Sequence, residues 1–179
     1  MRGSMSDLSL LRPVSPTRRD VDVASAQALA AHHALGRMSA CSSVAEFALA
    51  ANEFLASARG LAQAVAKLAR SAANDHGTTK RRAFAAWFAI QVTPVVQHPV
   101  QSELLRGAPE VYVARPARGS DAPPFAGAPM VRVPKPRPRA EDFYFDGVDK
   151  RPAIELCAEY LERVTSLIDD SRRTLARIA

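Results

Sequence analysis

The chain has 179 residues, a formal net charge of +6 and a sequence pI near 9.9. Its length suits one domain, and a hydrophobic content of 47% is typical of a globular protein. Aromatic residues make up only 6% of the chain, so helices must pack through small side chains, chiefly alanine. No stretch approaches the ~20 apolar residues of a membrane span, and two cysteines are too few for a disulfide framework or a zinc site.

The N-terminal region, residues 1–19, carries prolines and arginines among serines and predicts a flexible tail. Polar residues interrupt every apolar run there, which argues against a signal peptide and favours a cytoplasmic protein. Residues 20–179 are expected to form one helical-bundle domain. Its first helix should run from about Val21 to Met38, with Asp20 or Asp22 placed to cap it.

The second predicted helix, from Ser43 to Asp75, has the clearest pattern in the chain. Ser43 followed three residues later by Glu46 is a capping-box pattern. At ~1.5 Å per residue this helix would be about 45 Å long, so we expect it to form the spine of a bundle. Its bulky apolar residues recur at steps of three, four and seven, which places them on one stripe. These residues are Phe47, Phe54, Leu55, Leu61, Val65 and Leu68.

Proline residues divide the next part of the chain. A third helix is expected from Thr79 to Val92 and should be ended by Pro94. It carries the adjacent aromatic residues at 87–88, of which one should reach the core. A further short helix, from Val95 to Arg106, should be interrupted near its proline.

The character of the sequence then changes from helical to extended. Alternating apolar residues predict strands at 110–115 and 130–133, separated by a long loop rich in glycine and proline. The three aromatic residues at 143–145 should form a plug. A final helix from about Pro152 to Ile178 carries an apolar stripe, which includes Cys157 and is expected to pack on the spine helix.

Basic residues are concentrated in the proline-rich insertion at 115–140. They are Arg115, Arg118, Arg132, Lys135, Arg137 and Arg139. Such a group predicts contact with the phosphates of a nucleic acid or with an acidic protein. The simpler interpretation is a solvated basic loop, because no aromatic residues interleave with the arginines. Arginine outnumbers lysine 20 to 4, a bias that genomic base composition would also produce.

Two sequence blocks follow one another in an order typical of a known group. The first is the run 52–59, with a Phe-Leu-x-x-Ala-Arg core, followed by Phe-x-x-Trp-Phe at 84–88. The second is Phe-Tyr-Phe-Asp at 143–146, followed by the run 154–161. Together they resemble a bacterial group of uncharacterised proteins related to the HEPN-like helical bundles, over most of residues 43–175.

The resemblance implies a bundle that often dimerises and places one composite site at the two-fold interface. In active HEPN members an arginine and a histidine four to six residues apart line that site and cleave RNA. Imidazole moves the proton of the attacking 2′-hydroxyl, and guanidinium stabilises the phosphorane charge. The corresponding stretch here, 104–113, contains Arg106 but no histidine, and Pro109 would break the helix that normally carries the motif.

One arginine and histidine at a similar spacing do occur, at Arg70 and His76. With 20 arginines in the chain, one such pair is expected by chance. Six residues of helix turn through roughly 600°, which leaves the two side chains about 120° apart. The alternative to a catalytic pair is a polar helix end whose side chains complement the helix dipole.

The other histidines predict no metal site. His32 and His33 are adjacent, so they cannot chelate one ion as residues four apart on a helix could, and at least one should be at the surface. His98, just before a proline, is expected in a loop without a partner. The carboxylates at 169–170 should be surface residues paired with the arginines that follow them.

These observations predict a mainly α protein, a helical bundle around one long central helix with a small β-ribbon or loop insertion before the C-terminal helix. The expected function is a noncatalytic binding or regulatory module whose partner is RNA or an acidic protein, with a homodimer as the expected assembly and no cofactor. One rival hypothesis is a ribonuclease using Arg70 and His76, or Arg106 with a histidine from elsewhere. Another is a structural protein whose basic insertion docks on a second chain.

Overall fold

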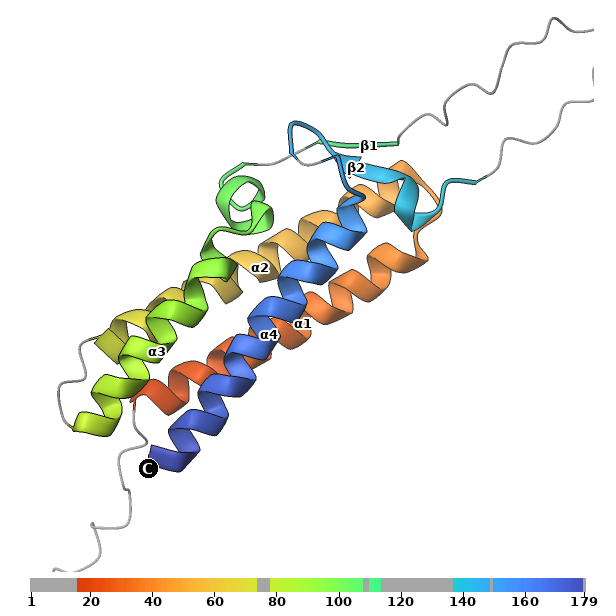
Figure 1. The fold of residues 1–179 in the computed structure, drawn as a ribbon. Helices are drawn as coiled ribbons and strands as arrows, with labels where there is room; N and C mark the ends of the chain where they lie inside the picture. Colours follow the sequence, from red (N-terminus) through yellow and green to blue (C-terminus); the bar gives the residue numbers. More distant parts are fainter. Residues whose placement is uncertain (1–15, 74–77, 108–109, 114–136, 149, 179) are drawn as a thin grey trace, which may run out of the picture.

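The computed structural model describes residues 16–73, 78–107, 110–113, 137–148 and 150–178, and four long helices account for most of them (Figure 1). These helices are α1 (Pro16–Ala40), α2 (Val44–Ala73), α3 (Thr79–Val96) and α4 (Ala153–Ile178). They alternate in direction along the chain and form one bundle. The predicted fold class, a mainly α helical bundle with a small β-ribbon, is therefore confirmed. No helix in the described ranges combines the length and apolarity needed to cross a bilayer.

The order of the helices around the bundle differs from the prediction in one respect. α1 packs against α2 and α4, and α3 packs against the same two helices. α4 therefore lies mainly diagonal to α2, whereas its apolar stripe was expected to pack on α2 as a spine. The stripe is buried as expected, but its closest neighbours come from α1 and α3 because four antiparallel helices each touch two neighbours along their length.

The core confirms the apolar stripe predicted on α2. All six of its bulky residues are buried, and they pack against a face of α1 that is built from alanine. Small side chains let the two helices approach closely. A Cβ atom placed on Gly60 of α2 would lie 2.8 Å from the side-chain oxygen of Gln27 on α1.

The start of α1 corrects two sequence predictions. The helix begins at Pro16, so residues 16–19 are helical although the tail was expected to extend through 1–19; residues 1–15 lie outside the described residues. Asp20 is not a cap. It is buried inside the helix, with an Oδ atom 2.9 Å from Nζ of Lys67, and Ser71 donates a hydrogen bond of 2.9 Å to its other oxygen. The carboxylate therefore ties α1 to the last turns of α2.

The start of α2 confirms the predicted cap at Ser43. The backbone N–H of Glu46 donates to Oγ of Ser43 at 3.3 Å. The Glu46 carboxylate accepts a hydrogen bond of 3.1 Å from the backbone N–H of Ser42, and this bond is the main reason that the pKa of Glu46 is lowered. Unpaired backbone N–H groups at a helix start are thereby satisfied by side chains.

The end of α3 differs from the prediction because Pro94 lies inside the helix. A proline removes one backbone donor, which a helix tolerates close to its end where tertiary packing holds the last turn. After a turn at 97–99, a short π-helix η1 (Val100–Leu104) follows. The guanidinium of Arg59 on α2 donates to the carbonyls of Leu105 at 3.2 Å and Gly107 at 2.8 Å, which anchors this segment to the bundle.

A two-stranded antiparallel ribbon covers one end of the bundle (Figure 1). It pairs β1 (Val111–Val113) with β2 (Phe143–Phe145), which follows the 3₁₀ turn η2 (Ala140–Asp142). The aromatic plug is thus itself a strand, and the strand predicted at 130–133 lies outside the described residues. Phe143 stacks on Phe47 of α2 with ring centroids 4.3 Å apart, so the ribbon is held on the core by its aromatic face.

Candidate functional site

The alternating directions of the helices bring four helix ends together at the end of the bundle remote from the ribbon (Figure 1). Ten cationic side chains lie in the first turns of α1 and α3 and the last two turns of α2 and α4, and all are exposed. We call this group the basic end. It consists of Arg18, Arg19, Lys67, Arg70, Lys80, Arg81, Arg82, Arg172, Arg173 and Arg177.

The charge of the described residues is strongly polarised along the bundle. Only four acidic residues accompany the basic end, namely Asp20, Asp22, Asp169 and Asp170. The other described residues carry eight Lys or Arg and ten Asp or Glu. Among the described residues, one end of the bundle is therefore clearly cationic while the others are slightly anionic, and the cationic end would attract a polyanion.

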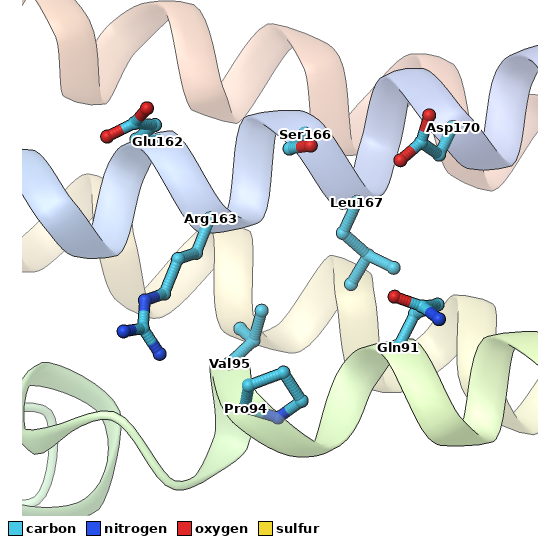
Figure 2. Close-up of a pocket in the computed structure, with 8 residues that line it drawn as sticks. All are labelled: Gln91, Pro94, Val95, Glu162, Arg163, Ser166, Leu167 and Asp170. Atoms are coloured by element: carbon cyan, nitrogen blue, oxygen red, sulfur yellow. The ribbon is translucent and has the colours of Figure 1, made fainter.

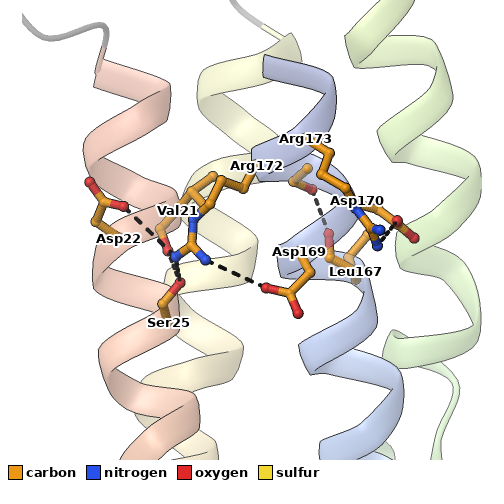
Figure 3. Close-up of polar contacts among 9 residues, drawn as sticks. Val21, Asp22, Ser25, Leu167, Asp169, Asp170, Arg172 and Arg173 are labelled. Carbon is orange, nitrogen blue, oxygen red and sulfur yellow. Dashed lines mark hydrogen bonds and ion pairs between the residues drawn. The ribbon is translucent and has the colours of Figure 1, made fainter. Parts of the chain in front are cut away.

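Part of this charge holds the helices together. Arg172 of α4 reaches across to α1, where it donates a hydrogen bond to Oγ of Ser25 and lies 3.9 Å from the carboxylate of Asp22 (Figure 3). It also lies 3.5 Å from Asp169 on its own helix. Arg173 is paired with Asp170 at 2.7 Å, so the predicted surface pairing of residues 169–170 is confirmed.

The remaining charge is available to a ligand. Six exposed cations of the basic end form no ion pair with any other described residue, namely Arg18, Arg19, Arg70, Lys80, Arg82 and Arg177. The first turns of α1 and α3 contain several cations and no acidic residue. Cations at a helix N-terminus oppose the helix dipole, so this placement does not stabilise the helices themselves. An anionic ligand would neutralise both the cations and the positive helix ends.

The seam between α3 and α4 is hollowed next to the basic end. One groove of about 380 Å³ lies between Pro94 and Val95 of α3 and Leu167 of α4, with polar side chains on its rim (Figure 2). A second pocket of about 430 Å³ shares Gln91 and Asp170 with the first, so the two lie end to end. The second pocket is the one that contains cations of the basic end.

The predicted basic insertion lies mostly outside the described residues. This applies to Arg115, Arg118, Arg132 and Lys135. Arg137 and Arg139 are described and exposed, and they precede η2 at the ribbon end of the bundle. These two are therefore remote from the basic end, which was not predicted from the sequence. Its signals in the sequence were the run Lys-Arg-Arg at 80–82 and the arginines at 172–173.

The described residues do not include both members of the candidate catalytic pair. Arg70 is exposed in the last turn of α2, and His76 lies outside the described residues. Arg106 is exposed in the turn after η1. Both His32 and His33 are exposed, which confirms the expected surface position. Within the described ranges, no three His, Cys, Asp or Glu side chains are grouped so that they could hold a metal ion.

His98 lies in the turn between α3 and η1, so its predicted loop position is confirmed, but the prediction that it has no partner is wrong. It is buried, with 3% of its surface exposed, and its Nε2 atom lies 3.5 Å from a carboxylate oxygen of Glu159 on α4. The backbone N–H of Val100 donates to its Nδ1 atom at 3.3 Å. Burial lowers the pKa of His98, while Glu159 acts in the opposite direction. Because the side chain of His98 is buried, it links the end of α3 to α4 and cannot be reached by a substrate.

Glu159 holds a small ion-pair network around that histidine. Its carboxylate lies 2.7 Å from a guanidinium nitrogen of Arg151 and 2.5 Å from one of Arg163. The hydrogen bond from Arg151 is the first cause of the lowered pKa of Glu159. The network is partly exposed and ties the start of α4 to the end of α3 through His98.

Comparison of the chain with protein-family models, with curated proteins and with solved structures found no match. The resemblance to HEPN-like bundles therefore stays a prediction. Any functional assignment rests on the geometry above, in which the basic end and the adjoining pocket are the prominent features.

Proposed function

We propose that this protein is a noncatalytic RNA-binding module that holds phosphates on the basic end of the bundle. The observation that carries the proposal is the convergence of ten exposed cations from four helix ends onto one pole. Eight of these ten are arginine, whose planar guanidinium matches phosphate oxygens in a bidentate way. The cations are spread over a broad surface, which suits a chain of phosphates better than a single small anion.

The helix N-termini support the same ligand class. Phosphate groups bind favourably at helix starts, because free backbone N–H groups and the helix dipole both favour negative charge. At the start of α3, Thr78 caps the helix by accepting a hydrogen bond of 3.2 Å from the N–H of Arg81. Lys80 and Arg82 in that same turn form no ion pair with a described residue. A phosphate backbone lying across this turn would meet unpaired positive charge.

The test is binding of a fluorescein-labelled single-stranded RNA, followed by anisotropy over a salt series. Affinity should fall linearly with salt on a logarithmic scale, with a slope of about −0.7 for each phosphate contacted. The double variant Lys80→Gln/Arg82→Gln should weaken binding and make the slope less negative by about 1.4 if both side chains contact phosphates. Gel analysis of the same RNA tests for cleavage, which would contradict a noncatalytic role.

The matched control removes the same charge from the opposite end. Arg137→Gln/Arg139→Gln also lowers the net charge by two, so general charge effects cancel between the variants. This control should leave affinity nearly unchanged. Equal losses in both variants would show that affinity follows net charge alone and would contradict the proposal. A loss confined to the control would place binding on the proline-rich insertion instead. Polyglutamate serves as a competitor, and preference for it over RNA would favour an acidic protein partner.

A further inference from the structure

The second pocket on the α3–α4 seam brings Trp87 together with cations of the basic end. Its volume is about 430 Å³, and its lining residues are Trp87, Gln91, Asp170, Arg173, Thr174 and Arg177. The lining is mostly polar, since an amide, a hydroxyl, a carboxylate and two guanidinium groups accompany the indole of Trp87. This composition suits a ligand with a flat face, polar edges and a negative charge.

Neighbouring aromatic rings hold Trp87 in position on one side. Its ring centroid lies 5.7 Å from that of Phe84 and 6.4 Å from that of Phe88, in tilted and edge-on arrangements. Phe88 is buried in the core while Trp87 is only partly buried, so the predicted division between the two adjacent aromatics is confirmed. The part of the indole that these contacts leave open lines the pocket. Its N–H forms no hydrogen bond with another described residue.

The charges around Trp87 favour a phosphate on one side only. Arg177 is exposed and forms no ion pair with a described residue. The carboxylate of Asp170, which would repel a phosphate, is neutralised by Arg173 at 2.7 Å. The neighbouring groove adds a further carboxylate, Glu162, and its guanidinium, Arg163, is already paired with Glu159. A phosphate is therefore better placed toward Arg177 and the basic end than along the groove.

We infer that this pocket is a nucleotide subsite, in which one unpaired RNA base stacks on Trp87 while its phosphate pairs with Arg177. The inference rests on the proposed RNA-binding function and adds to it a point of contact with a base. Stacking on an aromatic side chain accepts any base, because every base has a π face. Gln91 and Thr174 offer hydrogen-bonding groups to the base edge. The subsite therefore selects single-stranded over fully paired RNA.

The experiment uses Trp87 as its own probe, since the chain contains one tryptophan. A short oligoadenylate should quench the intrinsic fluorescence over the concentration range in which the anisotropy of the labelled RNA changes. An abasic oligonucleotide of the same length should bind more weakly and leave the fluorescence nearly unchanged. The Arg177→Gln variant should bind more weakly with a shallower salt slope, but should still be quenched at saturation.

Two substitutions at the aromatic position separate stacking from folding. Trp87→Leu should weaken RNA binding by about 5- to 100-fold, which corresponds to the loss of one stacked base. Trp87→Phe keeps an aromatic face and should restore most of that affinity. Thermal melting of both variants checks that the bundle remains folded. Affinity that depends on neither substitution would overturn the subsite.

The outcomes distinguish this inference from the proposed function. RNA binding that depends on salt and on Lys80 and Arg82, without quenching of Trp87, would sink the subsite and leave the proposed function standing. No RNA binding at all would remove both. An emission shift of Trp87 that follows protein concentration without RNA would show instead that a second copy of the chain covers the pocket, and would overturn the subsite.

Discussion

The imidazole of His98 and the carboxylate of Glu159 lie 3.5 Å apart and connect the junction after α3 to the first turns of α4. The Nδ1 atom of His98 accepts a hydrogen bond from the N–H of Val100, so the proton of the neutral ring is on Nε2, which faces Glu159. Protonation of Nδ1 would place two donors against each other. The hydrogen bond from Val100 therefore depends on a neutral ring, whereas the contact with Glu159 favours the protonated form.

We expect the stability of the protein to fall on mild acidification because of His98. Burial lowers its pKa in the folded state below the ordinary value of 6.5, so the unfolded chain takes up this proton first. The free energy of unfolding should be highest above pH 6.5 and should decrease as the pH falls toward the folded-state pKa, by at most about 1.4 kcal/mol per pH unit. Urea unfolding at neutral pH and at about pH 5 measures the effect.

The matched variants are His98→Asn and His32→Asn. Asparagine at position 98 retains an acceptor for the N–H of Val100 but does not titrate. The free energy of unfolding should therefore become nearly independent of pH above pH 5. The variant should also be somewhat less stable at all pH values. His32 is exposed and its replacement should leave the dependence intact. If the free energy of unfolding changed with pH equally in both variants, the role of His98 would be contradicted. Glu159 and Glu46, whose pKa values are lowered, affect stability only at lower pH.

The buried carboxylate of Asp20 should contribute measurably to stability. Asp20→Ala removes the partner of Lys67 and leaves Ser71 without its acceptor, so we expect a loss of about 1–2 kcal/mol in the free energy of unfolding. Asp22→Ala is the control, because this exposed side chain lies 3.9 Å from Arg172 and its loss should change stability by less than about 0.5 kcal/mol. Equal effects in denaturant melts would show that Asp20 is no better bound than a surface group.

Two helical glycines should respond differently to alanine. At Gly36 of α1 nothing lies within 4 Å of a new Cβ, so Gly36→Ala should stabilise the protein by about 0.5–1 kcal/mol. At Gly60 of α2 the new Cβ would meet the side-chain oxygen of Gln27 at 2.8 Å, and the gain should be smaller because that flexible side chain must move. Adding Gln27→Ala should increase the gain. A large loss in Gly60→Ala would mean that the helix backbones themselves are too close.

The two thiols should differ sharply in reactivity. Cys157 is fully buried in the apolar face of α4, as expected, and burial raises its pKa. Cys41 is partly exposed after α1, and its pKa is raised by burial and by the nearby carboxylate of Glu46. A maleimide at neutral pH should therefore label Cys41 slowly in the native protein and Cys157 only after unfolding. Rapid labelling of a native Cys41→Ser variant would contradict the buried position of Cys157.

Local patterns in the sequence predicted the helical elements well. Apolar spacing identified the buried stripe of α2, Ser43 marked its start, and Pro152 marked the start of α4 to within one residue, because each signal depends on neighbours in the chain. The predictions failed for residues whose surroundings are set by contacts with distant parts of the chain. Asp20 was expected at a helix start because its partners Lys67 and Ser71 are about fifty residues away, and His98 was expected to have no partner because Glu159 is on the last helix.

The candidate site shows the same division. Composition and apolar spacing are enough to predict a chain that is basic, rich in alanine and arginine, and built from amphipathic helices. It drew attention to the insertion at 115–140, because those charges are close together along the chain. The tertiary structure was needed to show that cations from four separate segments meet at one pole and that those of α4 lie beside Trp87. The reason is physical: antiparallel packing joins the first turns of α1 and α3 to the last turns of α2 and α4, a proximity that no local pattern records.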